Sequence, residues 1–451
     1  MTDTIIAQST PPGQSALAMV RVSGPLCEEI AQEALSLPCP TPRVCHLRNY
    51  QSLDSQTIVD QVIAVLFPMN KSFTGENTLE ISCHGNSFIV EKIIEDLLKR
   101  GCRIAKPGEF TQRAFLSGRI DLTQAESIAE LISAKSDAEL KIANFNLAGS
   151  QGKVYKSLQE RILRLQAQLE ASIDFPEEEI ESESKSVIIR VIDSIIEETS
   201  RLIENSAKNK ILSNAIKVLI LGPANVGKST LFNSFLGLER ALVSHNPGTT
   251  RDYISSQVSI GDYRVELIDC AGIRKTDNST ESLGIEKTIE IIDDAFLILF
   301  VIDGSLPYPT DFDQRALGKI KEKEIVIIEN KNDIPKVVSS EQYPTHVKSM
   351  EICAHKKSDV EKITSFINSY LTEKFSQDPS KEVIVNARHR KLLDSSLSHL
   401  MRAKKSMEEN EGEEFVLQEL FDCRSFIDEI IGVKTNEDVL DKLFGEFCIG
   451  K

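Results

Sequence analysis

Long apolar runs are missing from this sequence of 451 residues. The longest unbroken one, Ala295–Ile302, has 8 residues. Because a helix needs about 20 apolar residues to cross a bilayer, a membrane-spanning protein is excluded. The N-terminus has neither a basic start nor an apolar stretch with a small-residue cleavage site, so we expect a cytoplasmic protein.

Paired cysteines and an excess of positive charge are missing too. The 9 cysteines are scattered and never form a C-x-x-C pair, so neither a disulfide framework nor a zinc site is indicated. Lys and Arg number 52 against 68 Asp and Glu, which gives a net charge of -16. Since this charge repels a polyanion, binding of nucleic acid would need a local basic patch or a second protein.

Length and periodicity predict a multidomain chain in which one domain is inserted into another. Short alternating strands and turn residues at the start are typical of an α+β domain, whereas the segments before and after the middle of the chain have helical periodicity. Between them, four apolar strands separated by helical lengths predict a parallel α/β sheet: Ile216–Leu221, Tyr263–Ile268, Phe296–Ile302 and Ile325–Ile328. The predicted domains are 1–118 (N-terminal), 119–212 (helical, first half), 213–375 (inserted α/β) and 376–451 (helical, second half).

A glycine-rich loop, Gly222–Ser229 with the sequence GPANVGKS, follows the first of these strands and precedes a helix. This is the context of a phosphate-binding loop, in which backbone N–H groups surround the β-phosphate. Lys228 would place its charge at the β/γ oxygens, and the Ser229 hydroxyl would bind Mg²⁺. The inserted domain is therefore predicted to be a Ras-like P-loop G domain.

Two further motifs end strands of the same sheet. Asp269 begins the sequence DCAG, from which its carboxylate can reach the magnesium shell through water while the N–H of Gly272 senses a γ-phosphate. In the sequence NKND, the Asp333 carboxylate can accept hydrogen bonds from the N1–H and 2-amino groups of guanine. Adenine lacks this pair of donors, so the predicted ligand is GTP and not ATP.

The predicted GTP-binding residues extend over five segments, the last of which is CAH where G domains usually have Ser-Ala-Lys. They are Asn225, Val226, Gly227, Lys228, Ser229, Thr230, Ser244, His245, Asn246, Pro247, Gly248, Thr249, Thr250, Asp269, Cys270, Ala271, Gly272, Asn330, Lys331, Asp333, Cys353, Ala354 and His355.

The residue that orients the attacking water in Ras-like enzymes, a Gln after the Asp-x-x-Gly glycine, is replaced here by Ile273. An aliphatic side chain can neither orient water nor neutralise charge. The electrostatic stabilisation of hydrolysis must therefore come from elsewhere.

Signatures outside the G domain are more specific than the phosphate loop. They are Ala18–Gly24 (AMVRVSG), Ser72–Glu76 (SFTGE), Leu79–Gly85 (LEISCHG), Ala105–Phe115 (AKPGEFTQRAF), Asp121–Glu126 (DLTQAE) and the terminal Phe447–Lys451 (FCIGK). On these residues the chain resembles the MnmE (TrmE) family of tRNA modification GTPases over essentially its whole length.

The resemblance implies how hydrolysis is stabilised. In the family, a K⁺ ion held by neutral oxygens replaces the arginine finger, and the matching positions are Asn225, Ser244, Asn246 and Thr249. Thr250 matches a second Mg²⁺ ligand beside Ser229, and Glu281 matches the glutamate that orients water, acting with Lys228. The alternatives are that Asn225 is a polar loop residue and Glu281 a solvated carboxylate at a helix start.

The resemblance also implies that the N-terminal domain forms a homodimer and binds 5-formyl- or 5,10-methylene-tetrahydrofolate. The matching folate positions are Arg21, Glu80, Arg119 and Lys451, and the family usually has Lys where this chain has Arg119. Cys448 could act as a nucleophile, or it could be a small apolar residue that packs the C-terminal segment.

The implied function is potassium-dependent GTP hydrolysis in the addition of an aminomethyl or carboxymethylaminomethyl group to C5 of the wobble uridine of tRNA. The resemblance implies a heterotetramer with the FAD-dependent protein MnmG. This chain has no dinucleotide fingerprint of its own, so the redox cofactor is expected to come from that partner. Two alternatives stay open from the residues: a regulatory or ribosome-assembly GTPase switch without one-carbon chemistry, and a folate-dependent one-carbon transferase in which GTP gates the dimer.

Overall fold

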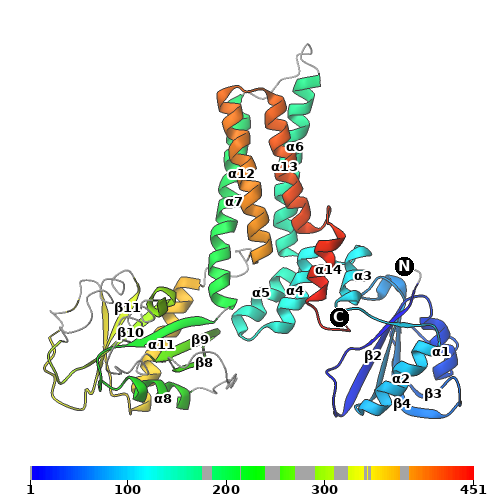
Figure 1. Cartoon of the computed structure of the whole chain (residues 1–451), viewed down its shortest axis with the longest axis horizontal. Helices are drawn as coiled ribbons and strands as arrows, with labels where there is room; N and C mark the ends of the chain where they lie inside the picture. Colours follow the sequence, from blue (N-terminus) through cyan, green and yellow to red (C-terminus); the bar gives the residue numbers. More distant parts are fainter. Residues whose placement is uncertain are drawn as a thin grey trace, which may run out of the picture. The chain divides into compact units, whose positions relative to one another are not determined.

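The computed structural model describes residues 3–174, 185–213, 215–238, 254–269, 290–308, 323–339, 343, 347–375 and 385–450. It has two compact units, each assembled from separate segments (Figure 1). The first unit consists of Met1–Ile132, Asn144–Arg201 and Ala387–Lys451, and the second of Ser133–Ala143 and Leu202–Asn386. The chain is therefore multidomain, and the segments on either side of the α/β part pack in one unit. No helix in the described ranges is long and apolar enough to cross a membrane.

The N-terminal part of the first unit is a six-stranded sheet with the order β3-β4-β5-β2-β1-β6, antiparallel except for the β1–β6 pair. Alternate residues of its strands are buried, and α1 and α2 cover the buried face. The elements are β1 Ile5–Gln8, β2 Leu17–Ser23, α1 Cys27–Leu35, β3 His46–Gln51, β4 Ile58–Phe67, η1 Met69–Lys71, β5 Thr78–His84, α2 Ser87–Lys99, β6 Arg103–Ile104 and α3 Glu109–Leu116.

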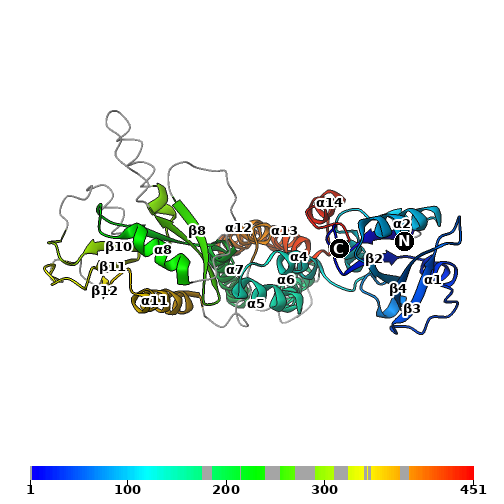
Figure 2. The ribbon, with the colours of Figure 1, turned by 90° about the horizontal axis from the view of Figure 1, so that it is seen from below.

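Helices form the rest of the first unit, where α13 packs against both α12 and α6 (Figures 1 and 2). One face of α6 is buried at the predicted helical spacing, including Leu158, Ile162, Leu165 and Leu169, all at most 1% exposed. The helices are α4 Leu122–Ser133, α6 Ser150–Asp174, α12 Ala387–Glu409, α13 Glu413–Ile431 and α14 Glu437–Gly445, together with the end of α5 Asp137–Leu147 and the start of α7 Lys185–Ser213, whose other parts belong to the second unit.

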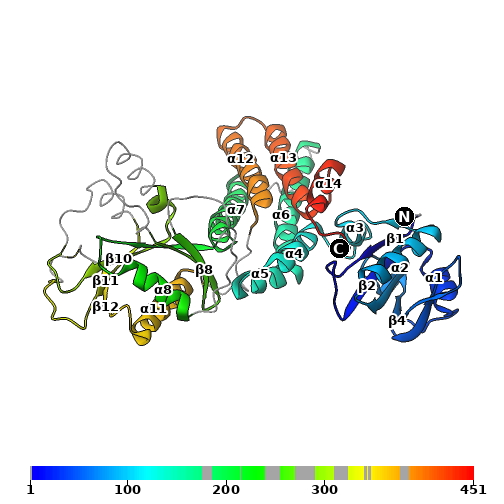
Figure 3. The ribbon, with the colours of Figure 1, turned by 60° about the horizontal axis from the view of Figure 1, so that its bottom comes forward.

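The second unit contains a six-stranded sheet with the order β12-β11-β10-β7-β9-β8, parallel except for the β8–β9 pair. Helices α8 and α11 pack on one face of it (Figure 3). The elements are β7 Ile216–Leu221, α8 Lys228–Leu238, β8 Ile254–Ile260, β9 Tyr263–Asp269, β10 Leu297–Asp303, β11 Ile325–Asn330, β12 Lys348–Glu351 and α11 Lys357–Phe375.

All four strands predicted for this sheet are present, but β8 and β12 were missed. Both are edge strands with little apolar sequence. In β8 only Val258 and Ile260 are buried, and no residue of β12 is. Edge strands are held by backbone hydrogen bonds to one neighbour and need no continuous apolar run, so the search for such runs did not find them.

A buried ionic cluster connects α4 with the start of α12, which follows the inserted unit in the sequence. The Glu126 carboxylate lies 2.6 Å from Arg388 Nε and 2.6 Å from His389 Nε2, and the His389 side chain is fully buried. Burial raises the pKa of Glu126, but the charges and hydrogen bonds of His389 and Arg388 outweigh it and lower this pKa to about 2.

Glu130, one helical turn after Glu126, has its pKa shifted in the opposite direction. Burial and then the charge of Glu126 raise it to about 7, although a hydrogen bond from Asn146 lowers it. The folded chain therefore binds this proton more tightly than the unfolded chain, in which the carboxyl titrates near 4.5. The stability that the proton contributes is complete below pH 4.5 and is lost as pH rises through 7.

We expect Glu130→Gln to stabilise the chain at pH 8, because glutamine stays neutral where the half-buried glutamate ionises in an environment that disfavours its charge. The expected gain in the free energy of unfolding is on the order of 2 kcal/mol at pH 8, and it should vanish towards pH 5. Thermal unfolding across this pH range measures it. Glu160→Gln, at an exposed carboxylate of α6, is the control. A gain that does not grow with pH would contradict the shift.

Candidate functional site

The loop between β7 and α8 is packed too tightly for side chains at its two glycines. Gly222 has φ 149°, and a Cβ there would lie 2.0 Å from the carbonyl oxygen of Val301. Gly227 has φ 99°, and its Cβ would lie 2.2 Å from Asn330 Nδ2. Between them, Asn225 is exposed and has the left-handed φ of 63°. The backbone is thus folded into a compact turn directly before the N-terminus of α8, where N–H groups favour an anion.

The first turn of α8 carries the predicted phosphate and magnesium residues. Lys228 is buried, and its ammonium donates to the carbonyl oxygen of Pro223 at 2.5 Å. Its charge therefore lies over the loop. Ser229 is exposed and Thr230 half-buried, so the Ser229 hydroxyl is accessible to a cation bound beside the loop.

Asp269 lies next to this loop because β9 pairs with β7. Its register partner is Ile220, two residues before Gly222, and its side chain is buried. A carboxylate at the carboxyl end of a strand that pairs with β7 is the type of oxygen ligand that Mg²⁺ prefers, as is the Ser229 hydroxyl, so these residues fit the ion.

Asn330, at the end of β11, connects the phosphate loop to the segment after β12. Its Nδ2 donates to the carbonyl oxygen of Val226 at 2.8 Å, and its Oδ1 accepts from the N–H of Ala354 at 2.9 Å. The side chain is buried, so both bonds are protected from water. The phosphate loop and the CAH segment are thereby held together.

The remaining residues predicted for the base lie at the same sheet edge. Asp333 is exposed, as a carboxylate that meets a ligand must be, whereas Cys353 and Ala354 are buried and His355 is exposed. The N–H of Cys353 donates to Asp359 Oδ2 at 2.9 Å. Because backbone bonds hold the CAH segment, its shape does not depend on the missing Ser and Lys.

Two residues that the sequence analysis did not single out support this edge. Asp359, in the first turn of α11, fixes Cys353, and its pKa is lowered by the hydrogen bond from Lys362 despite burial. Asp303, at the end of β10, pairs with Lys331. The sequence contained a signal for each residue. Asp359 is an acidic residue in the first turn of a helix, and Asp303 is an acidic residue at the end of an apolar strand.

Several predicted residues lie outside the described ranges, so the structure places none of them. They are Ser244, His245, Asn246, Pro247, Gly248, Thr249, Thr250, Cys270, Ala271, Gly272, Glu281 and Lys451. Of the predicted K⁺ ligands only Asn225 is described, and it is exposed. Its amide oxygen is the neutral type of donor that a monovalent cation needs.

Of the predicted folate residues, Arg21 and Glu80 are brought together in the N-terminal sheet. They are register partners on β2 and β5, and Arg21 Nη2 lies 2.8 Å from Glu80 Oε1. Arg21 Nη1 also donates to the carbonyl oxygen of Gly450 at 3.3 Å. Arg119 donates instead to the carbonyl oxygen of Met69 at 2.9 Å.

The C-terminal segment contacts the N-terminal sheet at more than one point. Ser9 Oγ donates to the carbonyl oxygen of Gly450 at 3.3 Å. The N–H of Gly108 donates to the carbonyl oxygen of Cys448 at 3.4 Å. The Cys448 side chain itself is exposed. Its thiol is therefore accessible to solvent, while its backbone ties the segment to the loop before α3.

Comparisons with known proteins agree over the whole chain. A family model described as "MnmE helical domain" matches residues 122–448, and one described as "GTP-binding protein TrmE N-terminus" matches residues 4–119. The tRNA modification GTPase MnmE of Opitutus terrae is 38% identical over 451 residues, which cover 100% of this chain and 99% of that protein. The same-named proteins of Desulforamulus reducens (36%, covering 100% and 99%) and Thermotoga maritima (35%, covering 100% of both) are similar over equal lengths.

Proposed function

The chain belongs to the MnmE family of tRNA modification GTPases, and from this membership we propose its chemistry in finer detail. It hydrolyses GTP with the help of K⁺ and Mg²⁺. It acts in the addition of an aminomethyl or carboxymethylaminomethyl group to C5 of the wobble uridine of tRNA, with a tetrahydrofolate as one-carbon source.

The observation that carries the GTPase part is the Asn330 link between the phosphate loop and the CAH segment. One buried side chain sets the distance between the residues proposed for the phosphates and those proposed for the base. A nucleoside triphosphate, in which one ribose joins the base to the phosphates, matches this arrangement.

The chain's own residues would divide the work of hydrolysis. Lys228 binds the β/γ oxygens, while Ser229, Thr250 and, through water, Asp269 hold Mg²⁺. Oxygens of Asn225, Ser244, Asn246 and Thr249 would hold K⁺, which would supply positive charge against the charge that develops on the phosphates. Glu281 orients the attacking water.

The folate part of the proposal is supported by the pairing of Arg21 with Glu80 beside the C-terminal segment. Carboxylate and guanidinium groups are the partners that a pterin ring and a glutamyl tail need. Arg119 and Lys451 complete the proposed set. We further propose a cytoplasmic homodimer that works with the flavoprotein MnmG.

Nucleoside analysis of tRNA from cells lacking this chain tests the proposed function. The C5-modified wobble uridine should disappear and return when the intact gene is supplied. Unchanged modification together with a defect in ribosome assembly would favour the regulatory GTPase instead.

Base selectivity should depend on Asp333. We expect Asp333→Asn to weaken GTP binding on the order of 100-fold, because an amide cannot accept from both donors of guanine. The variant should gain affinity for xanthosine triphosphate, which has an oxygen in place of the 2-amino group. Competition binding with both nucleotides measures this, and unchanged GTP affinity would show that the base binds elsewhere.

A further inference from the structure

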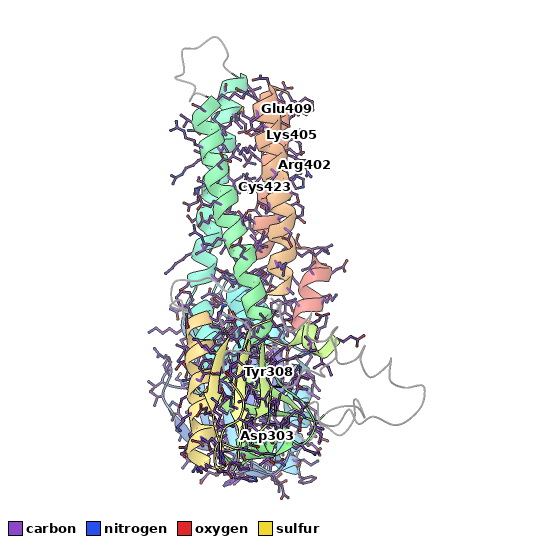
Figure 4. The ribbon with its side chains drawn as sticks, turned by 90° about the vertical axis from the view of Figure 1, so that its left-hand side faces the viewer. Asp303, Tyr308, Arg402, Lys405, Glu409 and Cys423 are labelled. Atoms are coloured by element: carbon purple, nitrogen blue, oxygen red, sulfur yellow. The ribbon has the colours of Figure 1, made fainter. Side chains whose placement is uncertain are left out.

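Asp303, which is labelled in Figure 4, lies at the end of β10. Its carboxylate is buried, and both of its oxygens bind neighbours. Its Oδ2 lies 2.5 Å from Lys331 Nζ, and its side chain is 7% exposed. Its Oδ1 accepts from the N–H of Ser305 at 3.0 Å and from the Ser305 hydroxyl at 2.6 Å. The carboxylate is thus fixed by its own turn before it meets the lysine.

The backbone at Lys331 has an unusual conformation. Lys331 has φ 67°, a left-handed conformation that a lysine adopts only under constraint. It follows Asn330, which is the register partner of Asp303. Through its ion pair with Asp303, the Lys331 side chain links the end of β11 to the end of β10.

The segment that carries Asp333 also closes onto this turn. The N–H of Gly304 donates to the carbonyl oxygen of Asn330 at 2.8 Å, and the N–H of Val337 donates to that of Gly304 at 2.9 Å. The turn after β10 thus supports both ends of the segment from Lys331 to Val337, on which Asp333 lies.

We propose that Asp303 is a positioning residue for guanine-nucleotide binding, which acts by holding the Lys331 side chain in place beside Asp333. This inference rests on the proposed function. A solvated lysine loses rotamer freedom when it binds a nucleotide, and this loss weakens binding. The ion pair with a buried carboxylate already restricts the Lys331 rotamers before the nucleotide binds, so that less entropy is lost on binding. With the ammonium held, the apolar stem of Lys331 is a fixed surface for a flat purine ring.

The charge state of Asp303 agrees with this role. Burial would raise its pKa, but hydrogen bonds from Lys331 and Ser305 outweigh burial and lower the pKa below its usual range. Asp303 is therefore ionised at neutral pH, and the attraction to Lys331 is between two full charges.

A double-mutant cycle on the full-length chain tests the proposal, with a fluorescent GDP analogue as the ligand. Asp303→Ala and Lys331→Ala should each weaken binding about tenfold, the worth of one charge-assisted hydrogen bond. If Asp303 acts through Lys331, the double variant should bind no more weakly than Lys331→Ala alone. Asp303→Asn, which keeps an oxygen acceptor for Lys331, should recover part of the loss.

The opposite end of the same unit offers a matched control. Lys217 and Asp294 pair at 2.7 Å before β10 begins, with Asp294 67% exposed. Asp294→Ala should leave the dissociation constant within about twofold. If the wild type binds the analogue and the loss of affinity in the double variant equals the product of the two single losses, Asp303 does not act through Lys331, and only the positioning role is overturned. A wild type that does not bind it would overturn the base site and this inference together.

Discussion

Replacing Asn225 with alanine is expected to abolish the acceleration of GTP hydrolysis by K⁺ over Na⁺. Ile273 stands where Ras-like enzymes use glutamine, so the proposed cation must supply the stabilisation that an arginine finger gives elsewhere. Such a finger is worth roughly 10³–10⁵ in rate, and we expect a loss on the order of 100-fold or more in K⁺. GDP affinity should change by less than about threefold, because the backbone and Lys228 are the groups proposed to make most of the phosphate contacts.

The backbone at Asn225 requires a second variant. With φ 63°, alanine would add strain that glycine and asparagine avoid. Asn225→Gly therefore removes the oxygen without the strain, and it should lose K⁺ stimulation as completely as Asn225→Ala. Asn225→Asp keeps an oxygen and should retain part of it. Steady-state hydrolysis in matched KCl and NaCl measures all three, and equal rates for the wild type in both salts would defeat the potassium proposal.

Local signals explain why so much of the α/β unit could be predicted. Its inner strands are mostly apolar, and Lys228, Asp269 and Asp333 stand at or shortly after strand ends within short motifs. Parallel strands place their carboxyl ends at one edge, so strand order along the chain already brings these motifs together. The edge strands β8 and β12 lack that signal, because a strand made mostly of polar or exposed residues has the same composition as a loop.

Contacts between distant residues could not be predicted in the same way. The hydrogen bond from Asn330 to Val226 joins residues 104 apart, and that from Arg21 to Gly450 joins residues 429 apart. The burial of His389 against Glu126 depends on two helices separated by the whole inserted unit. No local pattern specifies such a pair, because either partner alone looks like an ordinary charged residue on a helix.

The largest separation of activities is expected from deleting Cys448–Lys451. In the structure the Gly450 carbonyl oxygen accepts hydrogen bonds from Arg21 and Ser9. The deletion therefore removes Lys451 and also a hydrogen-bond acceptor of Arg21, both of which are proposed folate residues. The residues proposed for phosphate, metal and base all lie between Asn225 and His355. tRNA modification should therefore be lost, while K⁺-stimulated GTP hydrolysis stays within about twofold of wild type, as expected for independent sites.

Two smaller changes separate the possible reasons for that loss. Cys448→Ser keeps the backbone bond to Gly108 and removes only the thiol, so it abolishes modification only if Cys448 is a nucleophile. Removing Lys451 alone keeps Gly450 in place and tests the proposed charge on the glutamyl tail of the folate.

Glu80→Ala should reproduce the effect of the tail deletion from the other end of the chain. It leaves Arg21 without its carboxylate and the proposed pterin site without its acceptor, and we expect affinity for 5-formyltetrahydrofolate to fall on the order of 100-fold. Glu95→Ala, at an exposed carboxylate of α2, is the control and should bind normally. Calorimetry on the wild type, the tail deletion and both substitutions decides the matter. Undiminished affinity in Glu80→Ala and in the tail deletion would show that the one-carbon unit is bound elsewhere, since both changes remove groups that contact Arg21.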